Sequence, residues 1–109
     1  MSDAIDRITS HWRTRARMRK IEVPEWGITI HYRPPNIAQR INLEKALKER
    51  GDHAAAVEAV LLLALDEQGR RIFSDGHRAE LMHEADPDVI VRVAGELMQG
   101  PDPEAVEKN

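Results

Sequence analysis

The chain has 109 residues, a length typical of one domain. Hydrophobic residues make up 41% and charged residues 32%, which supplies a core and excludes a wholly disordered chain. There are no cysteines, so a disulfide scaffold, a thiol nucleophile and any cysteine-based metal site are excluded. The longest apolar run, Val60 to Leu65, is far short of the ~20 residues that span a membrane. Because charged residues follow Met1 where a signal peptide would be apolar, we expect a cytoplasmic protein that does not enter a membrane.

The net charge of −3 is unevenly distributed along the chain. Residues 1–50 hold 11 Lys/Arg against 6 Asp/Glu, whereas residues 51–109 hold 5 against 13. Such a basic excess can bind nucleic acid or an anionic membrane, or it can form a solvated helix face or contact the acidic half of the protein. Alternating arginines are spread around a helix, which disfavours one stripe that faces a groove of DNA. This 13–20 cluster consists of Arg13, Arg15, Arg17, Arg19 and Lys20.

The N-terminal third predicts one helix and one hairpin. A helix is expected over 4–17, after Asp3 as N-cap, and its sparse apolar stripe indicates only loose attachment. Period-two alternation on both sides of a turn at Pro24 to Gly27 then predicts a β-hairpin across 20–33. A lone hairpin is marginal in water, so a helix must cover its apolar face. The stripe of the first helix is Ile5, Ile8, Trp12 and Ala16.

Four further helices are predicted after Pro34-Pro35. Asn36 with Gln39 has the form of a capping box for a helix over 36–50, and Gly51 suits its end. The third helix spans 53–65, and Ser74-Asp75 and Asp86-Pro87 begin helices over 75–84 and 87–99. The helix over 36–50 is expected to have a broad apolar face made of Ile37, Ile41, Leu43 and Leu47.

These elements define a mainly α domain of the α+β class, with four to five helices and one short N-terminal β-hairpin. We expect a basic N-terminal helix over 1–19, a single helical domain over 20–100, and a disordered acidic tail over 101–109.

Motifs for catalysis or metal binding are scarce. Glu80-x-x-His83 has the local form of a carboxylate metal site in a helical bundle, but such a site needs a second copy and further glutamates. No H-E-x-x-H, G-x-S-x-G or P-loop pattern occurs. We therefore expect a non-enzyme without metal or cofactor, and a metal-dependent enzyme is the less favoured alternative.

The third helix carries more apolar residues than one face needs. Leu61 and Leu65 lie on the side of Val57, whereas Leu62 and Leu63 point the other way. Either this helix is central and covered on both sides, or Leu62 and Leu63 meet a partner. Trp26, at the hairpin turn, is likewise either a ring packed on a neighbouring helix or an interface anchor.

Two stretches together carry a resemblance to a known family. The segment IEVPEWGITIHYRP, from Ile21 to Pro34, resembles the hairpin that opens many tail assembly chaperones of long-tailed phages, prophages and gene transfer particles. The segment LLLALDEQGRRIFSD, from Leu61 to Asp75, is similar to the later signature of those proteins. The sequence departs from the family at Gly76-His77, where acidic residues are usual.

The resemblance implies a non-enzymatic chaperone that binds the hydrophobic tape measure protein and keeps it soluble. Such a protein helps to recruit tail tube subunits, the major tail protein, and is absent from the finished particle. Homo-oligomers are a further expectation. The expected partner-binding residues are Trp26, Leu62, Leu63, Ile72 and Phe73.

A rival hypothesis of another class is a small nucleic-acid-binding regulator that uses the 13–20 cluster. Consecutive short helices and the positive N-terminal half favour it. The acidic total, the lack of a recognisable recognition helix and the four aromatic residues count against it.

Overall fold

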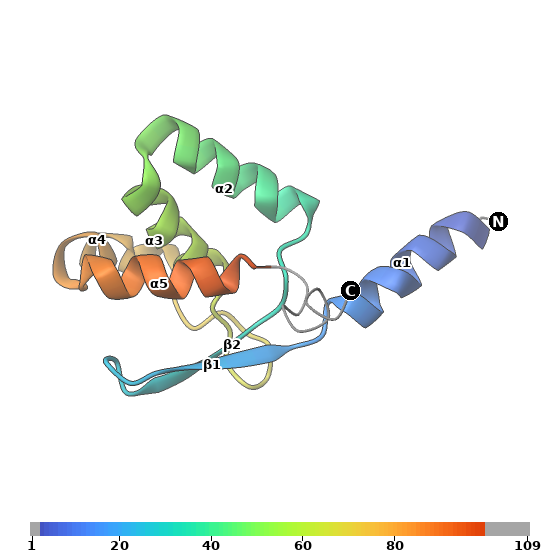
Figure 1. Cartoon of the computed structure of the whole chain (residues 1–109), viewed down its shortest axis with the longest axis horizontal. Coiled ribbons are helices and arrows are strands. Elements are labelled where there is room, and N and C mark those ends of the chain that lie inside the picture. The colour runs from blue at the N-terminus through green and yellow to red at the C-terminus, as the bar shows by residue number, and fades with distance from the viewer. Residues whose placement is uncertain (1–2, 100–109) are drawn as a thin grey trace, which may run out of the picture.

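The computed structural model describes residues 3–99 and has five α-helices, one two-stranded sheet and one 3-10 turn within them. It confirms the predicted mainly helical α+β domain (Figure 1). The expected disordered tail over 101–109 lies outside the described residues. In chain order the elements are α1 (Asp3–Arg15), β1 (Arg19–Val23), β2 (Ile28–Tyr32), α2 (Ile37–Arg50), α3 (Asp52–Leu63), η1 (Asp75–His77), α4 (Arg78–Glu84) and α5 (Pro87–Leu97).

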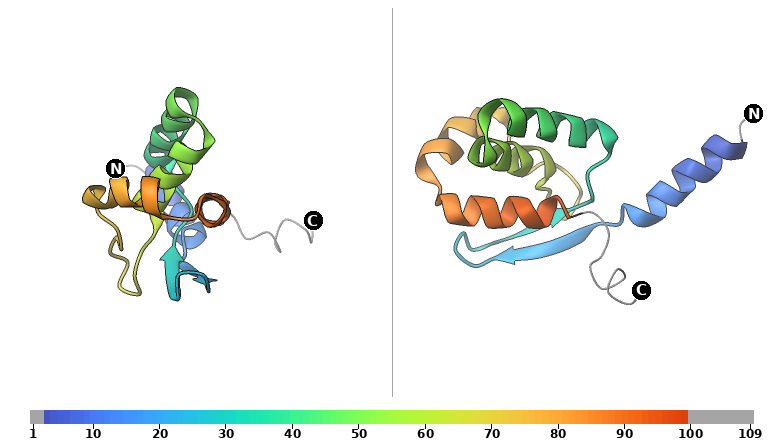
Figure 2. Two further views of the ribbon diagram at one scale, coloured as in Figure 1. Left: turned by 90° about the vertical axis from the view of Figure 1, so that its left-hand side faces the viewer. Right: turned by 45° about the horizontal axis from the view of Figure 1, so that its top comes forward.

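Helix α3 is the centre of the domain. It packs against α2, α4 and α5, which lie around it (Figures 1 and 2). A helix that is apolar on all sides is a buried helix, and its small alanines let the neighbouring helices approach closely. Its buried side chains are Ala54, Ala55, Ala56, Val57, Ala59, Val60, Leu61 and Leu63.

The hairpin covers the side of the core next to α5. Its strands pair antiparallel with Ile21 opposite Ile30, and Val23, Ile30 and Tyr32 are buried. Gly27 has φ +66°, a conformation that favours glycine, and it closes the expected turn. The carboxylate of Glu25 accepts hydrogen bonds from both terminal nitrogens of Arg92 at 2.6 and 2.7 Å, which ties the turn to α5.

The segment that follows α3 pairs with strand β2 and then turns back towards α3. The N–H of His31 donates to the Leu65 carbonyl at 2.8 Å, and the N–H of Leu65 donates to the His31 carbonyl at 2.7 Å. Oδ1 of Asp66 then accepts from the N–H groups of Gln68 and Arg70, both at 2.9 Å. These bonds form a turn over 66–69 and bring Arg71 back beside α3.

The local helix signals are confirmed with small shifts. The side chains of Asn36 and Gln39 each bond the backbone of the other at 2.9 Å, which is the expected capping box. Asp86 caps α5 through the N–H of Asp88 at 2.9 Å. The helix expected over 75–84 instead begins as the 3-10 turn η1, whose His77 Nδ1 accepts from the N–H of Ser74 at 3.0 Å.

The broad apolar face expected on α2 is wrong. Only Leu43, of the four residues assigned to it, is buried, and Ala46 is its partner in the core. At about 100° per residue, Ile37 and Ile41 point to the opposite side of the helix from Leu43 and Ala46. Ile37 is 77% exposed and Ile41 59% exposed.

Helix α1 leaves the body and projects away from it (Figures 1 and 2). None of its side chains is buried, which confirms the expected loose attachment. Three residues of the apolar stripe are exposed, Ile5 at 49%, Ile8 at 62% and Trp12 at 39%, whereas Ala16 follows the end of α1 and is half-buried.

Candidate functional site

Three neighbouring hollows lie along the flank of α2. The first, which we name the elbow, lies between α1 and the start of α2 and has a volume of about 700 Å³. Its wall is mostly apolar, with Ile8 and Trp12 on one side and Ile37 on the other. Two arginines, Arg15 and Arg40, stand at its edge.

The second hollow, the Leu62 hollow, has a volume of about 330 Å³ and lies between the end of α1 and the end of α3. Leu62 and Leu65 contribute its apolar floor, and Trp12 and Arg33 contribute to its walls. Leu62 is half-buried, so part of its side chain stays open to a partner.

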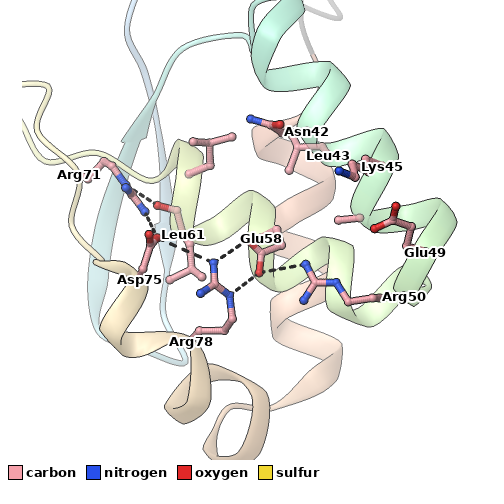
Figure 3. A pocket seen from close by; sticks show the side chains of 12 residues that line it. Asn42, Leu43, Lys45, Glu49, Arg50, Glu58, Leu61, Arg71, Asp75 and Arg78 are labelled. Carbon is pink, nitrogen blue, oxygen red and sulfur yellow. Dashed lines mark hydrogen bonds and ion pairs between the residues drawn. The ribbon is translucent and has the colours of Figure 1, made fainter.

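The third hollow, the polar cleft, has a volume of about 480 Å³ and lies between α2, α3 and η1–α4 (Figure 3). Its floor holds Leu43, Leu61 and Leu62, and its rim is charged. Leu43 and Leu61 are buried, so Leu62 is the more open of the three leucines.

The three hollows form one continuous track. The elbow and the Leu62 hollow share Trp12, Pro34 and Asn36. The Leu62 hollow and the polar cleft share Leu62 and Arg71. The track therefore runs from the projecting helix, across the end of α3, to the start of α4, with Leu62 near its middle.

A charged cluster fixes the walls of the polar cleft. The carboxylate of Glu58 on α3 accepts from Nε and Nη2 of Arg78 at 2.5 and 2.9 Å, and Nη2 of Arg50 on α2 lies at 3.5 Å (Figure 3). The two hydrogen bonds from Arg78 lower the pKa of Glu58, an effect opposed by burial. Because Arg50, Glu58 and Arg78 come from three helices, this cluster joins α2, α3 and α4.

Arg71 holds the end of α3 to the loop that follows. Its Nε donates to the carbonyl of Leu61 at 2.8 Å, and its Nη2 donates to Oδ1 of Asp75 at 3.2 Å. Leu61 belongs to the last turn of α3, where carbonyl groups lack partners within the helix. The arginines of the cleft are thus engaged with carboxylates and a carbonyl, which suits a rigid wall rather than proton transfer.

The structure separates the five residues expected to bind a partner. Leu62 and Leu63 both line the Leu62 hollow, but Leu62 is half-buried whereas Leu63 is only 3% exposed and belongs to the core. The partner-binding role expected of Leu63 stays a prediction, and its neighbours in the protein cover most of its side chain. Trp26, Ile72 and Phe73 are half-buried against the core and do not line the three hollows. Phe73 also meets the ring of His77 edge-on, with centroids 6.1 Å apart.

The 13–20 cluster does not lie on one helix. Arg13 and Arg15 end α1, Arg17 lies in the connection, and Arg19 and Lys20 belong to β1. The alternation that appears in the sequence is thus divided between a helix and a strand. This division provides no continuous basic helix to enter a DNA groove.

The described part of the chain was compared with the requirements of a metal cluster and of a membrane-spanning helix. Within residues 3–99, no three His, Asp or Glu side chains come together in a way that could hold a metal ion. In the same range, none of the helices has the length and apolar character needed to cross a membrane.

Several residues of the track were missed from the sequence. Trp12 was assigned to the sparse stripe of a loosely attached helix and Ile37 to a broad apolar face, and only the position of α1 shows that both line the elbow. The sequence could have indicated Glu58, because it is the one charged residue between Ala54 and Leu65. A charge within a buried helix needs a partner, but the sequence does not show that Arg78 supplies it.

Comparison with known proteins identifies the fold of the chain. No family model and no curated protein matches the sequence. A solved structure, that of the bacteriophage HK97 tail assembly chaperone, matches with a TM-score of 0.57 and 19% sequence identity. The match covers 94% of this chain and 100% of that chain. The chain therefore has a tail assembly chaperone fold, which confirms at the level of fold the resemblance noted in the sequence.

Proposed function

We propose that this protein is a phage tail assembly chaperone that binds the tape measure protein through the track. The observation that carries the proposal is the combination of the fold shared with the HK97 chaperone and a continuous track that the protein leaves uncovered, apolar in the elbow and mixed polar and apolar in the other two hollows. An apolar helix laid in a groove is a common mode of peptide recognition.

The chemistry of the track suits such a partner. A tape measure protein presents long apolar helices, which aggregate when they are not covered. Leu62, Trp12 and Ile37 offer apolar contacts along the track, and the charged rim of the polar cleft keeps the complex soluble. Binding of this kind needs no catalytic group, which is consistent with the engaged state of the arginines of the cleft.

The proposed role extends to tail assembly. By holding the tape measure protein in a soluble form in the host cytoplasm, the chaperone keeps it available for the tail tube subunits, the major tail protein. It then leaves as the tube closes around the tape measure protein, so it is absent from the finished particle.

The test is co-expression of the full chain with an apolar helical fragment of the tape measure protein from the same phage or prophage. We expect the wild-type chain to keep the fragment soluble and to be retained with it on an affinity resin. Leu62→Asp should abolish capture, because it places a charge in the middle of the track while its side chain stays partly hydrated.

Val91→Asp is the matched control. Val91 lies on α5, is 43% exposed and does not line the track, so this variant should capture the fragment as the wild type does. Capture by Leu62→Asp at the wild-type level would remove Leu62 from the interface. An insoluble fragment in the presence of wild-type chain would contradict the proposed function.

The nucleic-acid hypothesis is tested with duplex DNA in a salt titration. Binding through the 13–20 cluster would weaken steeply between low and moderate salt, because each phosphate contact releases counterions. We expect no sequence-specific complex, since the cluster is divided between α1 and β1.

A further inference from the structure

We propose that the track selects an amphipathic partner helix whose apolar stripe is flanked by aspartate or glutamate. This inference rests on the proposed function, because it names the chemistry of the segment that the track holds. It is carried by cations that occur in all three hollows, by their lack of partners in the protein, and by the apolar surface that lies between them.

Each of the three hollows contains a cation that the protein leaves unpaired. Arg15 and Arg40 line the elbow, Arg33 lines the Leu62 hollow, and Lys45 lines the polar cleft. All four are exposed, and within residues 3–99 none of them takes part in an ion pair. Glu49, in the polar cleft, is the acidic lining residue in the same state.

The other charges of the track neutralise one another. Glu58 is paired with Arg50 and Arg78, and Asp75 is paired with Arg71 and lies 3.8 Å from Arg78 (Figure 3). The charge that remains available to a partner is therefore positive, although the whole chain has a net charge of −3. A surface of this kind attracts a segment with acidic side chains.

In the elbow, the arginines lie on the same helix faces as the apolar residues. Ile8, Trp12 and Arg15 follow one another at spacings of four and three residues along α1, so they share one face. Ile37 and Arg40 are three residues apart on α2 and also lie on one side. Each wall of the elbow thus presents an apolar surface beside an arginine, which matches a partner helix with a carboxylate beside its apolar stripe.

Helix stability explains Arg15 but not Arg40. Arg15 lies in the last turn of α1, where a cation interacts favourably with the helix macrodipole. Arg40 lies in the first turn of α2, where a cation is unfavourable, and this turn contains no acidic residue. Pairing with a carboxylate of a partner gives Arg40 a role that its own helix does not.

Arg33 is the available cation of the Leu62 hollow. Its guanidinium lies beside Gly69, where a Cβ atom would come within 3.4 Å of Nη1. Arg71, the other cation of this hollow, already donates to the Leu61 carbonyl and to Asp75. A partner carboxylate that reaches the hollow therefore meets Arg33.

The apolar residues between the cations favour a peptide over a nucleic acid. Ile8 and Ile37 in the elbow, and Leu62 beyond it, offer contacts that a phosphate backbone does not use. Trp12 is the one aromatic residue among those that line the three hollows, whereas proteins that bind single strands stack successive bases on several aromatic rings. An acidic amphipathic helix uses both the apolar surface and the cations.

The first test compares three synthetic helical peptides of about 18 residues, each about 27 Å long. They share one apolar stripe and differ in the residues that flank it, which are glutamate, glutamine or lysine. By fluorescence anisotropy with the full chain at about 0.05 M salt, the glutamate peptide should bind at least about tenfold tighter than the lysine peptide, with the glutamine peptide between them. The difference should shrink at about 0.5 M salt. Equal affinities at low salt, or no binding of the three peptides, would overturn the proposal.

The second test reverses the charge of the elbow. Arg15→Glu with Arg40→Glu should weaken binding of the glutamate peptide at least about tenfold and strengthen binding of the lysine peptide. Lys20→Glu with Lys48→Glu is the control, because it changes the net charge equally at exposed, unpaired positions of the described chain that do not line the three hollows. The control should bind the peptides as the wild type does. Equal weakening in both variants would assign the preference to overall charge and overturn the proposal.

Two other occupants of the track are outcomes of the same experiments. An oligonucleotide that displaces the glutamate peptide at a lower concentration than the unlabelled peptide does would assign the cations to phosphate groups. A change in the sedimentation of the chain alone on reversing the elbow, with the peptide preference unchanged, would assign the elbow to a second copy of the chain. Either result would overturn the proposal.

Capture of the tape measure fragment separates this inference from the proposed function. Equal affinity for the three peptides, together with capture of the fragment, would overturn the charge selection and leave the proposed function standing. A preference for the glutamate peptide without capture of the fragment would support the charge selection and contradict binding of the tape measure protein. We expect both the preference and the capture.

Discussion

Helices α1 and α3 have similar lengths, 13 and 12 residues, but opposite relations to the rest of the protein. Helix α3 is buried on nearly every side, whereas α1 has no buried side chain. The body around α3 holds the hydrophobic core and the ion pairs that join elements distant in sequence. The arm, α1, holds an apolar stripe that the body does not cover. The hydrophobic core and an uncovered apolar stripe thus lie in different parts of one small chain.

The two regions should differ most in how far a substitution by aspartate lowers the free energy of unfolding. Leu63→Asp buries a carboxylate in the core at a position that is 3% exposed, and we expect a loss of several kcal/mol or failure to fold. Ile8→Asp on the arm, at 62% exposure, should leave the free energy of unfolding nearly unchanged. Urea unfolding followed by circular dichroism makes the comparison, and a stably folded Leu63→Asp variant would show that α3 is not the centre of the core.

A smaller loss is expected at the charged cluster of the body. Glu58→Gln should reduce the free energy of unfolding by about 1–3 kcal/mol, because it leaves the partly buried Arg78 and its neighbour Arg50 without their carboxylate. Glu49→Gln is the matched control, since Glu49 is exposed at the end of α2 and forms no ion pair within residues 3–99. Equal stability of the two variants would show that the cluster does not join the helices.

Acid should weaken the hold of the hairpin on α5. Hydrogen bonds from Arg92 lower the pKa of Glu25 to about 2, from an ordinary value of 4.5. A lowered pKa in the folded state contributes stability above the ordinary pKa, and this contribution is lost as the pH falls from about 4.5 towards about 2. The pair is half-exposed, so the effect on the melting temperature is small.

The variant Glu25→Gln isolates this contribution. Its melting temperature should fall less than that of the wild type between pH 5 and pH 2, measured by thermal unfolding in matched buffers of about 0.1 M ionic strength. Parallel curves for the two proteins would mean that the Glu25–Arg92 pair does not contribute in solution.

Removal of the arm should have the smallest effect on stability. A chain that starts at Arg17 lacks α1 but keeps the hairpin and every helix of the core. We expect its free energy of unfolding in dilute solution to change by less than about 1 kcal/mol, since α1 buries none of its side chains. A larger loss in urea unfolding would show that α1 packs against the body.

Most of the fold could be predicted from the sequence because its signals are local. The hairpin is indicated by the alternation of apolar and polar residues on both sides of Pro24 to Gly27. Helices α2 and α5 are indicated by their N-caps, Asn36 and Asp86, which bond backbone groups no more than three residues away. The sparse stripe of α1 correctly indicated loose attachment. The face of α2 was not predictable, because Ile37 and Leu43 are equally apolar and only the position of α3 decides which of them is covered.

The candidate site was predictable only in part. An excess of leucine on the third helix identified Leu62 and Leu63 together. Both line the Leu62 hollow, but the surrounding elements leave Leu62 half-buried and cover Leu63 almost completely. The partners of Glu58 and Glu25 lie 20 and 67 residues away in sequence, so their pairing follows from tertiary structure alone. The elbow exists because α1 turns away from the body, which no local pattern encodes.

Amide hydrogen exchange of the chain alone and of the chain with the tape measure fragment tests most directly the division between a stable body and an uncovered arm. In the chain alone, amides of α3 and α5 should be strongly protected, whereas those of α1 should exchange almost as in an unfolded chain. With the fragment bound, α1 should gain protection. Protection of α1 equal to that of α3 in the chain alone, or no gain with the fragment, would contradict the account.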